Sequence, residues 1–92
     1  MNERVFTQEP MAINGFTFKR RMKRFDTKVL LKVMDFDTFE LYQSYYNESY
    51  YLLDKERGEM IEVYANEDMN KIENVEHLIG SYHLINDTCH HG

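Results

Sequence analysis

A chain of 92 residues has room for one hydrophobic core, so we expect a single domain over residues 1–92. Hydrophobic residues make up 42% of it, and seven Tyr and six Phe are among them, which excludes a disordered chain although 29% of the residues are charged. No apolar run approaches a membrane span, no secretory signal pattern is present, and Cys89 is the only cysteine. We therefore expect a cytoplasmic protein without a membrane partner or an internal disulfide.

The net charge of −5 conceals two opposed halves. Residues 1–34 carry eight Lys or Arg against three acids, and residues 35–92 carry three bases against thirteen acids. The first part therefore has a charge of +5 and the second a charge of −10. An asymmetry of this size bears on partners and association, and it says nothing about the fold.

The first predicted element is a β-hairpin centred on Asn14-Gly15. Both residues tolerate positive φ, as the two-residue type I′ turn requires, and apolar residues flank them. Pro10 lacks a backbone N–H, so the first strand must lie at a sheet edge. The turn predicts these opposite pairs: Ile13 with Phe16, Met11 with Phe18, and Glu9 with Arg20.

The second strand is predicted to run to Phe25, reverse at Asp26-Thr27 and pair with the next strand. The chain is predicted to reverse again at 35–37, 47–49 and 56–58, with Gly58 in the left-handed conformation of the last turn. With these turns, the apolar side chains of all six strands lie on the same face of the sheet. This register predicts the following pairs: Arg20 with Val33, Met22 with Leu31, Arg24 with Val29, Leu53 with Ile61, and Tyr51 with Val63. The spacing of Phe18, Met22 and Phe25 leaves a basic amphipathic helix over 16–25 as the alternative.

After Ala65 the apolar period changes from two to that of a helix. The predicted buried stripe is Met69, Ile72, Val75, Ile79 and Tyr82. Asn66 or Asp68 can cap the helix, and Gly80 either ends it or lies inside it. Residues 86–92 are predicted to form a flexible tail. The fold class is therefore α+β: an antiparallel meander sheet of about six strands packed on one C-terminal helix.

The outer face of the predicted sheet is the candidate binding surface. Alternation places cations and aromatic side chains there, and aromatic and Arg residues are enriched at protein interfaces. The same combination holds single-stranded nucleic acid, with bases stacked on rings and phosphates met by cations. The candidate partner-binding residues are Lys19, Arg21, Lys23, Lys32, Tyr42, Tyr46 and Tyr50.

Enzymatic chemistry has little support in the sequence. There is no nucleophile motif and no glycine-rich phosphate loop, and Asp35 and Asp37 flank a turn where Asp is favoured for local backbone hydrogen bonds. His77, His83 and Cys89-His90-His91 lack the spacing of a zinc site. We therefore expect no enzyme activity, no catalytic residue, no cofactor and no metal.

These features predict a non-enzymatic protein-binding module, for example an inhibitor or adaptor of phage type, that uses the basic and aromatic sheet face. A single-stranded RNA or DNA-binding protein using the same face is one alternative, although the acidic remainder of the chain disfavours phosphate binding. A self-associating protein, in which the basic hairpin meets the acidic half of another copy, is a second alternative. The composition resembles that of small proteins of low-GC Gram-positive bacteria and their phages.

Overall fold

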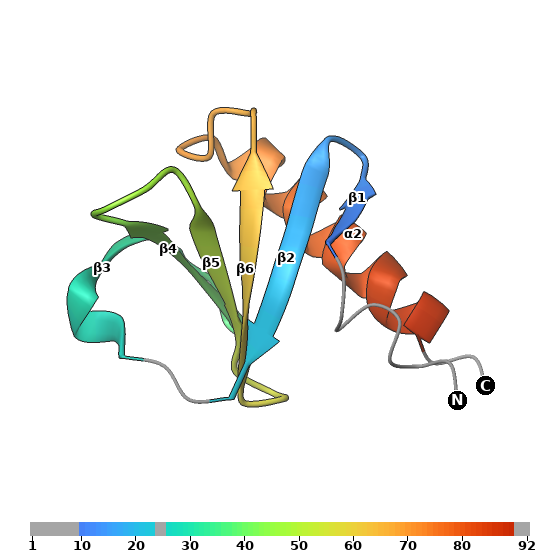
Figure 1. Ribbon diagram of the computed structural model, residues 1–92, viewed down its shortest axis with the longest axis horizontal. Helices are drawn as coiled ribbons and strands as arrows, with labels where there is room; N and C mark the ends of the chain where they lie inside the picture. The colour runs from blue at the N-terminus through green and yellow to red at the C-terminus, as the bar shows by residue number, and fades with distance from the viewer. Residues whose placement is uncertain (1–9, 24–25, 90–92) are drawn as a thin grey trace.

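The computed structural model describes residues 10–23 and 26–89. It has the expected α+β architecture: six antiparallel strands form one sheet, and a C-terminal helix packs on one of its faces (Figure 1). The elements are β1 (Met11–Ile13), β2 (Phe16–Met22), the short 3-10 helix η2 (Thr27–Val29), β3 (Leu30–Asp35), β4 (Phe39–Ser44), β5 (Tyr50–Asp54), β6 (Glu59–Ala65) and α2 (Ile72–Cys89). The face toward α2 is called the inner face below, and the opposite one the outer face.

The β1–β2 hairpin forms as predicted. Asn14 and Gly15 have φ of 54° and 88°, and Met11 lies opposite Phe18. The strand β1 lies at the sheet edge, in agreement with Pro10 before it. The alternative helix over 16–25 is excluded for residues 16–22, while Glu9, Arg24 and Phe25 lie outside the described residues.

The predicted pairing of β2 with β3 is wrong. The strand order is β1-β2-β6-β5-β4-β3, so the meander runs from β3 to β6 and the first hairpin joins it beside β6. The reason lies in the cross-strand pairs: Phe18 lies opposite Val63 and Arg20 opposite Glu62. Pairing with β3 would have set Arg20 against Val33 and left its charge without a carboxylate.

The register of β5 differs from the prediction by one residue. Leu52 and Tyr50, rather than Leu53 and Tyr51, lie opposite Ile61 and Val63. The turn is four residues long because the Asp54 carboxylate accepts hydrogen bonds from the backbone N–H groups of residues 56 and 57, at 3.0 and 3.1 Å. Gly58 has the predicted positive φ, of 64°. The extra loop residue turns every side chain of β5 to the other face.

The core lies between the inner face and α2. Phe16 and Phe18 from β2, together with buried residues of β4, β5 and β6, form one cluster with buried residues of α2. Figure 1 shows the helix lying across this face of the sheet. The helix stripe is shifted from the prediction, since Ile72 is 53% exposed and Met69 is buried ahead of the helix. Over residues 72–87, the buried residues of the helix are Val75, Leu78, Ser81, Tyr82 and Ile85.

The helix continues further than predicted. It passes through Gly80, which settles the open alternative, and reaches Cys89. The predicted tail over 86–92 is therefore helical up to 89, and residues 90–92 lie outside the described part. Ile85 is fully buried and Asn86 accepts a hydrogen bond from β2, so contacts with the sheet hold this end of the helix.

The same Gly→Ala change should have opposite effects at two positions. Gly15 needs positive φ, and a Cβ at Gly80 meets no atom within 4 Å. We expect Gly15→Ala to lower the free energy of unfolding by about 1–2 kcal/mol, and Gly80→Ala to raise it by about 0.4–1 kcal/mol. Urea denaturation of both variants measures this. If both substitutions changed the free energy of unfolding by the same amount and in the same direction, the turn geometry would be contradicted.

Candidate functional site

The cations of β2 do not divide between the faces as predicted. A bulge between Phe18 and Arg20 shifts the alternation, so Arg20 points to the outer face and Arg21 to the inner one. We had predicted the reverse for both. Arg20 donates from Nε to Glu62 at 2.9 Å, and the Glu62 carboxylate also accepts from Ser49 Oγ at 2.9 Å. The bulge therefore gives each arginine its own carboxylate on β6.

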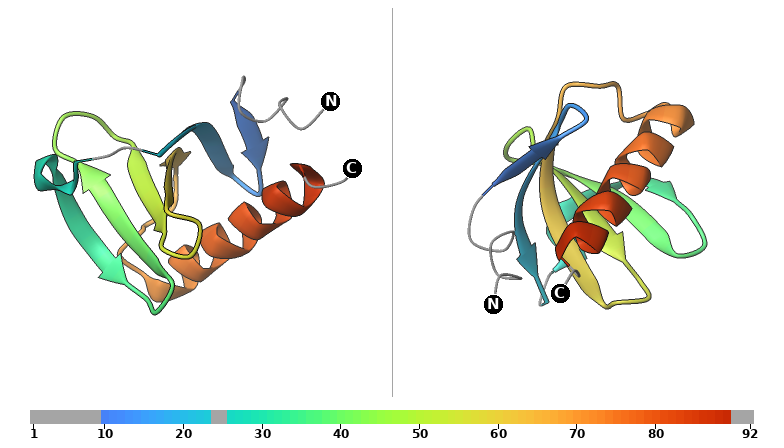
Figure 2. Two further views of the ribbon diagram at one scale, coloured as in Figure 1. Left: turned by 90° about the horizontal axis from the view of Figure 1, so that it is seen from below. Right: turned by 90° about the vertical axis from the view of Figure 1, so that its right-hand side faces the viewer.

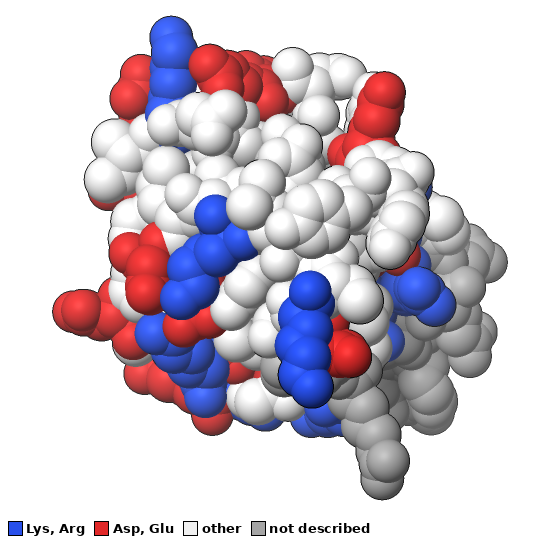
Figure 3. Space-filling view, turned by 90° about the vertical axis from the view of Figure 1, so that its left-hand side faces the viewer, with Lys and Arg blue, Asp and Glu red and all other residues white. Residues whose placement is uncertain are grey.

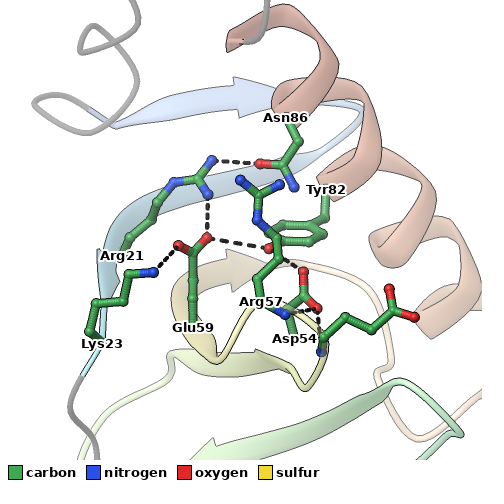
Figure 4. Close-up of polar contacts among 8 residues, drawn as sticks. Arg21, Lys23, Asp54, Arg57, Glu59, Tyr82 and Asn86 are labelled. Atoms are coloured by element: carbon green, nitrogen blue, oxygen red, sulfur yellow. Dashed lines mark hydrogen bonds and ion pairs between the residues drawn. The ribbon is translucent and has the colours of Figure 1, made fainter.

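Arg21 belongs to a buried polar cluster between β2, β6 and the end of α2 (Figure 4). Its guanidinium pairs with the Glu59 carboxylate through Nη1 and donates from Nη2 to Asn86 Oδ1 at 2.7 Å. The guanidinium carbon also lies 6.0 Å from the centre of the Tyr82 ring. The side chains of Arg21 and Glu59 are 14% and 7% exposed, so this ion pair is largely out of water.

Tyr82 joins the second carboxylate to the cluster. Its hydroxyl donates to Asp54 Oδ2 at 2.8 Å and lies 3.4 Å from Glu59 Oε2. Burial, supported by the neighbouring Asp54 carboxylate, raises the pKa of Tyr82 well above its usual value. Asp54 therefore has two tasks, because its other oxygen fixes the β5–β6 turn.

Two carboxylates and a tyrosine could in principle transfer protons. Here Asp54, Glu59 and Tyr82 are 4%, 6% and 0% exposed, and their polar atoms are engaged with one another. A substrate would have to separate the helix from the sheet to reach them. The cluster instead fixes the end of α2 on the sheet, because breaking a buried pair leaves an uncompensated charge.

Two cations contact Glu59, and they should differ greatly in their effect. Arg21→Met leaves the carboxylate buried without its main partner, so we expect a loss of about 3–5 kcal/mol of unfolding free energy. Lys23 lies 3.7 Å from the same carboxylate but is 72% exposed. Lys23→Met should therefore cost less than about 1 kcal/mol. Chemical denaturation checks both, and similar losses would contradict a structural role for Arg21.

The predicted aromatic residues are also dispersed. Tyr46 is 82% exposed in the β4–β5 turn, whereas Tyr42 lies on the outer face but is only 7% exposed. Tyr50 packs against the core on the inner face, because of the register shift. Tyr45, beside Tyr46 in the sequence, is 61% exposed. The exposed aromatic cluster of Tyr42, Tyr46 and Tyr50 is therefore not formed.

Tyr42 takes part in a charged network instead. Its hydroxyl donates to Glu40, whose carboxylate lies 3.1 Å from Lys55 Nζ and 3.7 Å from Lys32 Nζ. Burial and the hydrogen bond to Glu40 raise the pKa of Tyr42 to about 12. The hydrogen bond from Tyr42, with the nearby lysines, lowers the pKa of Glu40.

This raised pKa predicts a loss of stability in alkali. The folded state holds the Tyr42 proton more tightly than the unfolded chain, whose tyrosine titrates near pH 10.0. The contribution is present below pH 10 and is lost as the pH rises toward 12. We expect Tyr42→Phe to lose less stability over this range than the wild type, measured by urea denaturation. Tyr46→Phe, at an exposed position, should decline like the wild type, and identical declines for all three proteins would refute the assignment.

The outer face contains a groove that the sequence did not reveal. The side chains of Arg20 and Met22 on β2 line one side of it, and Val29 and Leu30 line the other. Since β2 and β3 are not neighbours in the sheet, these walls can meet only because the sheet curls, as Figure 2 shows. Tyr51 and Met60 also line the groove, which measures 180 Å³, and Asp26 completes it.

Among the described residues of the outer face, basic side chains lie next to acidic ones. Lys32 lies 3.3 Å from Asp35 and 3.7 Å from Glu40, and Arg20 pairs with Glu62. Lys19 Nζ lies 5.9 Å from the centre of the Tyr64 ring. Figure 3, which looks at the end of the molecule formed by β3 and η2, shows basic and acidic side chains interspersed. Of the predicted binding residues, Lys19 and Lys32 are exposed on this face, and Arg21 is not.

Comparison with protein-family models, with curated proteins and with solved structures gives no significant match. In the described residues no group of three or more His, Cys, Asp or Glu is arranged to hold a metal ion. No helix in that part of the chain is long and apolar enough to cross a bilayer. The function therefore has to be inferred from the surfaces themselves.

Proposed function

We propose that this protein is a non-enzymatic protein-binding module that engages its partner through the outer face of the sheet. The observation that carries the proposal is the groove between β2 and η2. Its lining is mainly apolar, with Met22, Val29 and Leu30 on the walls, while Arg20 and Asp26 supply polar groups. An apolar hollow beside charged groups matches the arrangement of protein interfaces, in which an apolar centre is surrounded by polar residues.

The size of the groove supports a protein partner over a cofactor. At 180 Å³ it is smaller than the roughly 300–1,000 Å³ of small-molecule sites, and it suits one or two side chains of a partner. Val29 on its wall is 47% exposed, and such an exposed apolar residue beside a hollow is the kind of surface that a partner covers.

Charge pairing weakens the nucleic-acid alternative. A phosphate approaching Arg20 or Lys32 has to compete with a carboxylate that already accepts from each of them. Binding by counterion release gains most from unpaired cations. Self-association through opposed halves is weakened for the same reason, because Arg20, Arg21 and Lys23 already face the acids of β6.

Two matched substitutions test the surface. Val29 and Leu31 are 47% and 49% exposed, but only Val29 lines the groove. In affinity capture from cells that express the protein, Val29→Glu should remove a specific protein partner, and Leu31→Glu should retain it. The melting temperature should change little in either variant, because both side chains are half exposed.

Nuclease treatment and raised salt complete this experiment. A protein partner held by apolar contacts should survive both treatments. Recovery of nucleic acid that falls steeply with salt would favour the alternative function. Recovery of the protein's own chain alone would favour self-association, and equal capture by both variants would place the site elsewhere.

A further inference from the structure

A second groove lies on the other side of the molecule, between the β3–β4 turn and α2. It measures 390 Å³ and has two walls and a floor. Phe36, Asp37 and Thr38 of the turn form one wall, and the floor is Phe39, which is only 6% exposed. The facing wall comes from one side of the helix and consists of Glu76, Ile79 and His83. The two grooves share no lining residue.

The carboxylates of the β3–β4 hairpin and the facing side of α2 divide into paired and unpaired ones. On the outer face Asp35 and Glu40 are both paired with Lys55, at 3.4 and 3.1 Å. Asp37 and Glu76, which lie on opposite walls of the second groove, form no ion pair with any described residue and are exposed. The groove therefore has an apolar floor between two unneutralised negative charges.

The floor of the groove is aromatic. The Phe39 and His83 rings are nearly perpendicular, with centroids 5.6 Å apart and planes at 84°. An apolar floor of this kind favours an aliphatic or aromatic side chain. A Lys or Arg on either side of that side chain would carry the charge complementary to Asp37 and Glu76.

We propose that this groove binds a cationic segment of a partner protein, in which an apolar side chain is flanked on each side by Lys or Arg. The apolar side chain lies on Phe39 and Ile79, and the two cations pair with Asp37 and Glu76. This surface is separate from the outer face, so one copy of the protein can hold two partners. The module then acts as an adaptor that joins an apolar contact on one side to a basic segment on the other.

A capped pentapeptide is the probe that tests this. It has Phe at its centre, Ala on either side and Lys at both ends, so that in an extended chain the Phe and both Lys point the same way. Titration into the ¹⁵N-labelled protein should shift the amide signals of Phe39, Ile79 and His83, with a dissociation constant in the millimolar range. A peptide with Glu in place of Lys should not bind, and one with Ala in place of Phe should bind more weakly.

Isosteric variants separate charge in the groove from net charge. Asp37→Asn combined with Glu76→Gln should raise the dissociation constant roughly threefold to tenfold. Glu67→Gln combined with Glu73→Gln removes the same total charge from exposed positions outside the groove, and should leave binding unchanged. All four side chains are exposed, so the fold should survive in both variants.

Several outcomes would overturn the proposal. The Lys and Glu peptides would bind equally well, or the two double variants would change the dissociation constant by the same factor. A third such outcome is that millimolar peptide shifts no amide signal of the groove residues. Groove signals that shift when the protein alone is concentrated would indicate a second copy as the occupant, and would also overturn it. Val29→Glu should not affect this titration, because Val29 does not line the second groove. The peptide titration and the capture experiment on the outer face can therefore fail independently of each other.

Discussion

The arrangement of the whole molecule depends on the pairing of β2 with β6. Each of the two arginines in the middle of the chain's most basic segment meets a carboxylate on β6, one on each face of the sheet. The Arg21–Glu59 pair is almost dry, and Asn86 and Tyr82 extend it onto the helix. Because a buried charge is tolerated only with its partner in place, this contact fixes the sheet and the helix relative to each other.

The same pairing changes the meaning of the charge asymmetry in the sequence. Two halves with charges of +5 and −10 would be expected to present opposed fields to the solvent. The fold instead brings the basic strand beside the acidic strand, so that much of the positive charge is neutralised within the molecule. Among the described residues, Asp37 in the β3–β4 turn and Glu76 on the helix stay exposed without an ion pair.

The sequence predicted features that depend on local chemistry. The Asn14-Gly15 turn, the edge position of β1 and the positive φ of Gly58 all follow from the backbone preferences of single residues. The number of strands and the presence of a C-terminal helix follow from the period of the apolar residues.

Features that depend on distant partners could not be read in this way. No glycine or proline near Lys19 indicates the bulge in the sequence. The bulge exchanged the faces on which Arg20 and Arg21 were predicted to lie. Asp54, which fixes the lengthened β5–β6 turn, is itself held by Tyr82 of the distant helix, and the longer turn reversed the faces of β5. Both errors moved side chains from one face to the other, which is why the predicted site had the right strands and several wrong residues. The grooves depend on sheet curvature and helix placement, which no local pattern encodes.

The strand order also dictates when parts of the chain can come together. The strands β3 to β6 are joined by short turns, so each can pair with the strand that precedes it. The β1–β2 hairpin, however, is made first and has its place beside β6, with Arg20 and Glu62 separated by 42 residues. Closing so long a loop costs more entropy than closing a turn, and contacts of this kind slow folding. During synthesis the basic hairpin can therefore pair with β6 only after the last strand of the sheet has been made. Until then its cations are accessible to other anions.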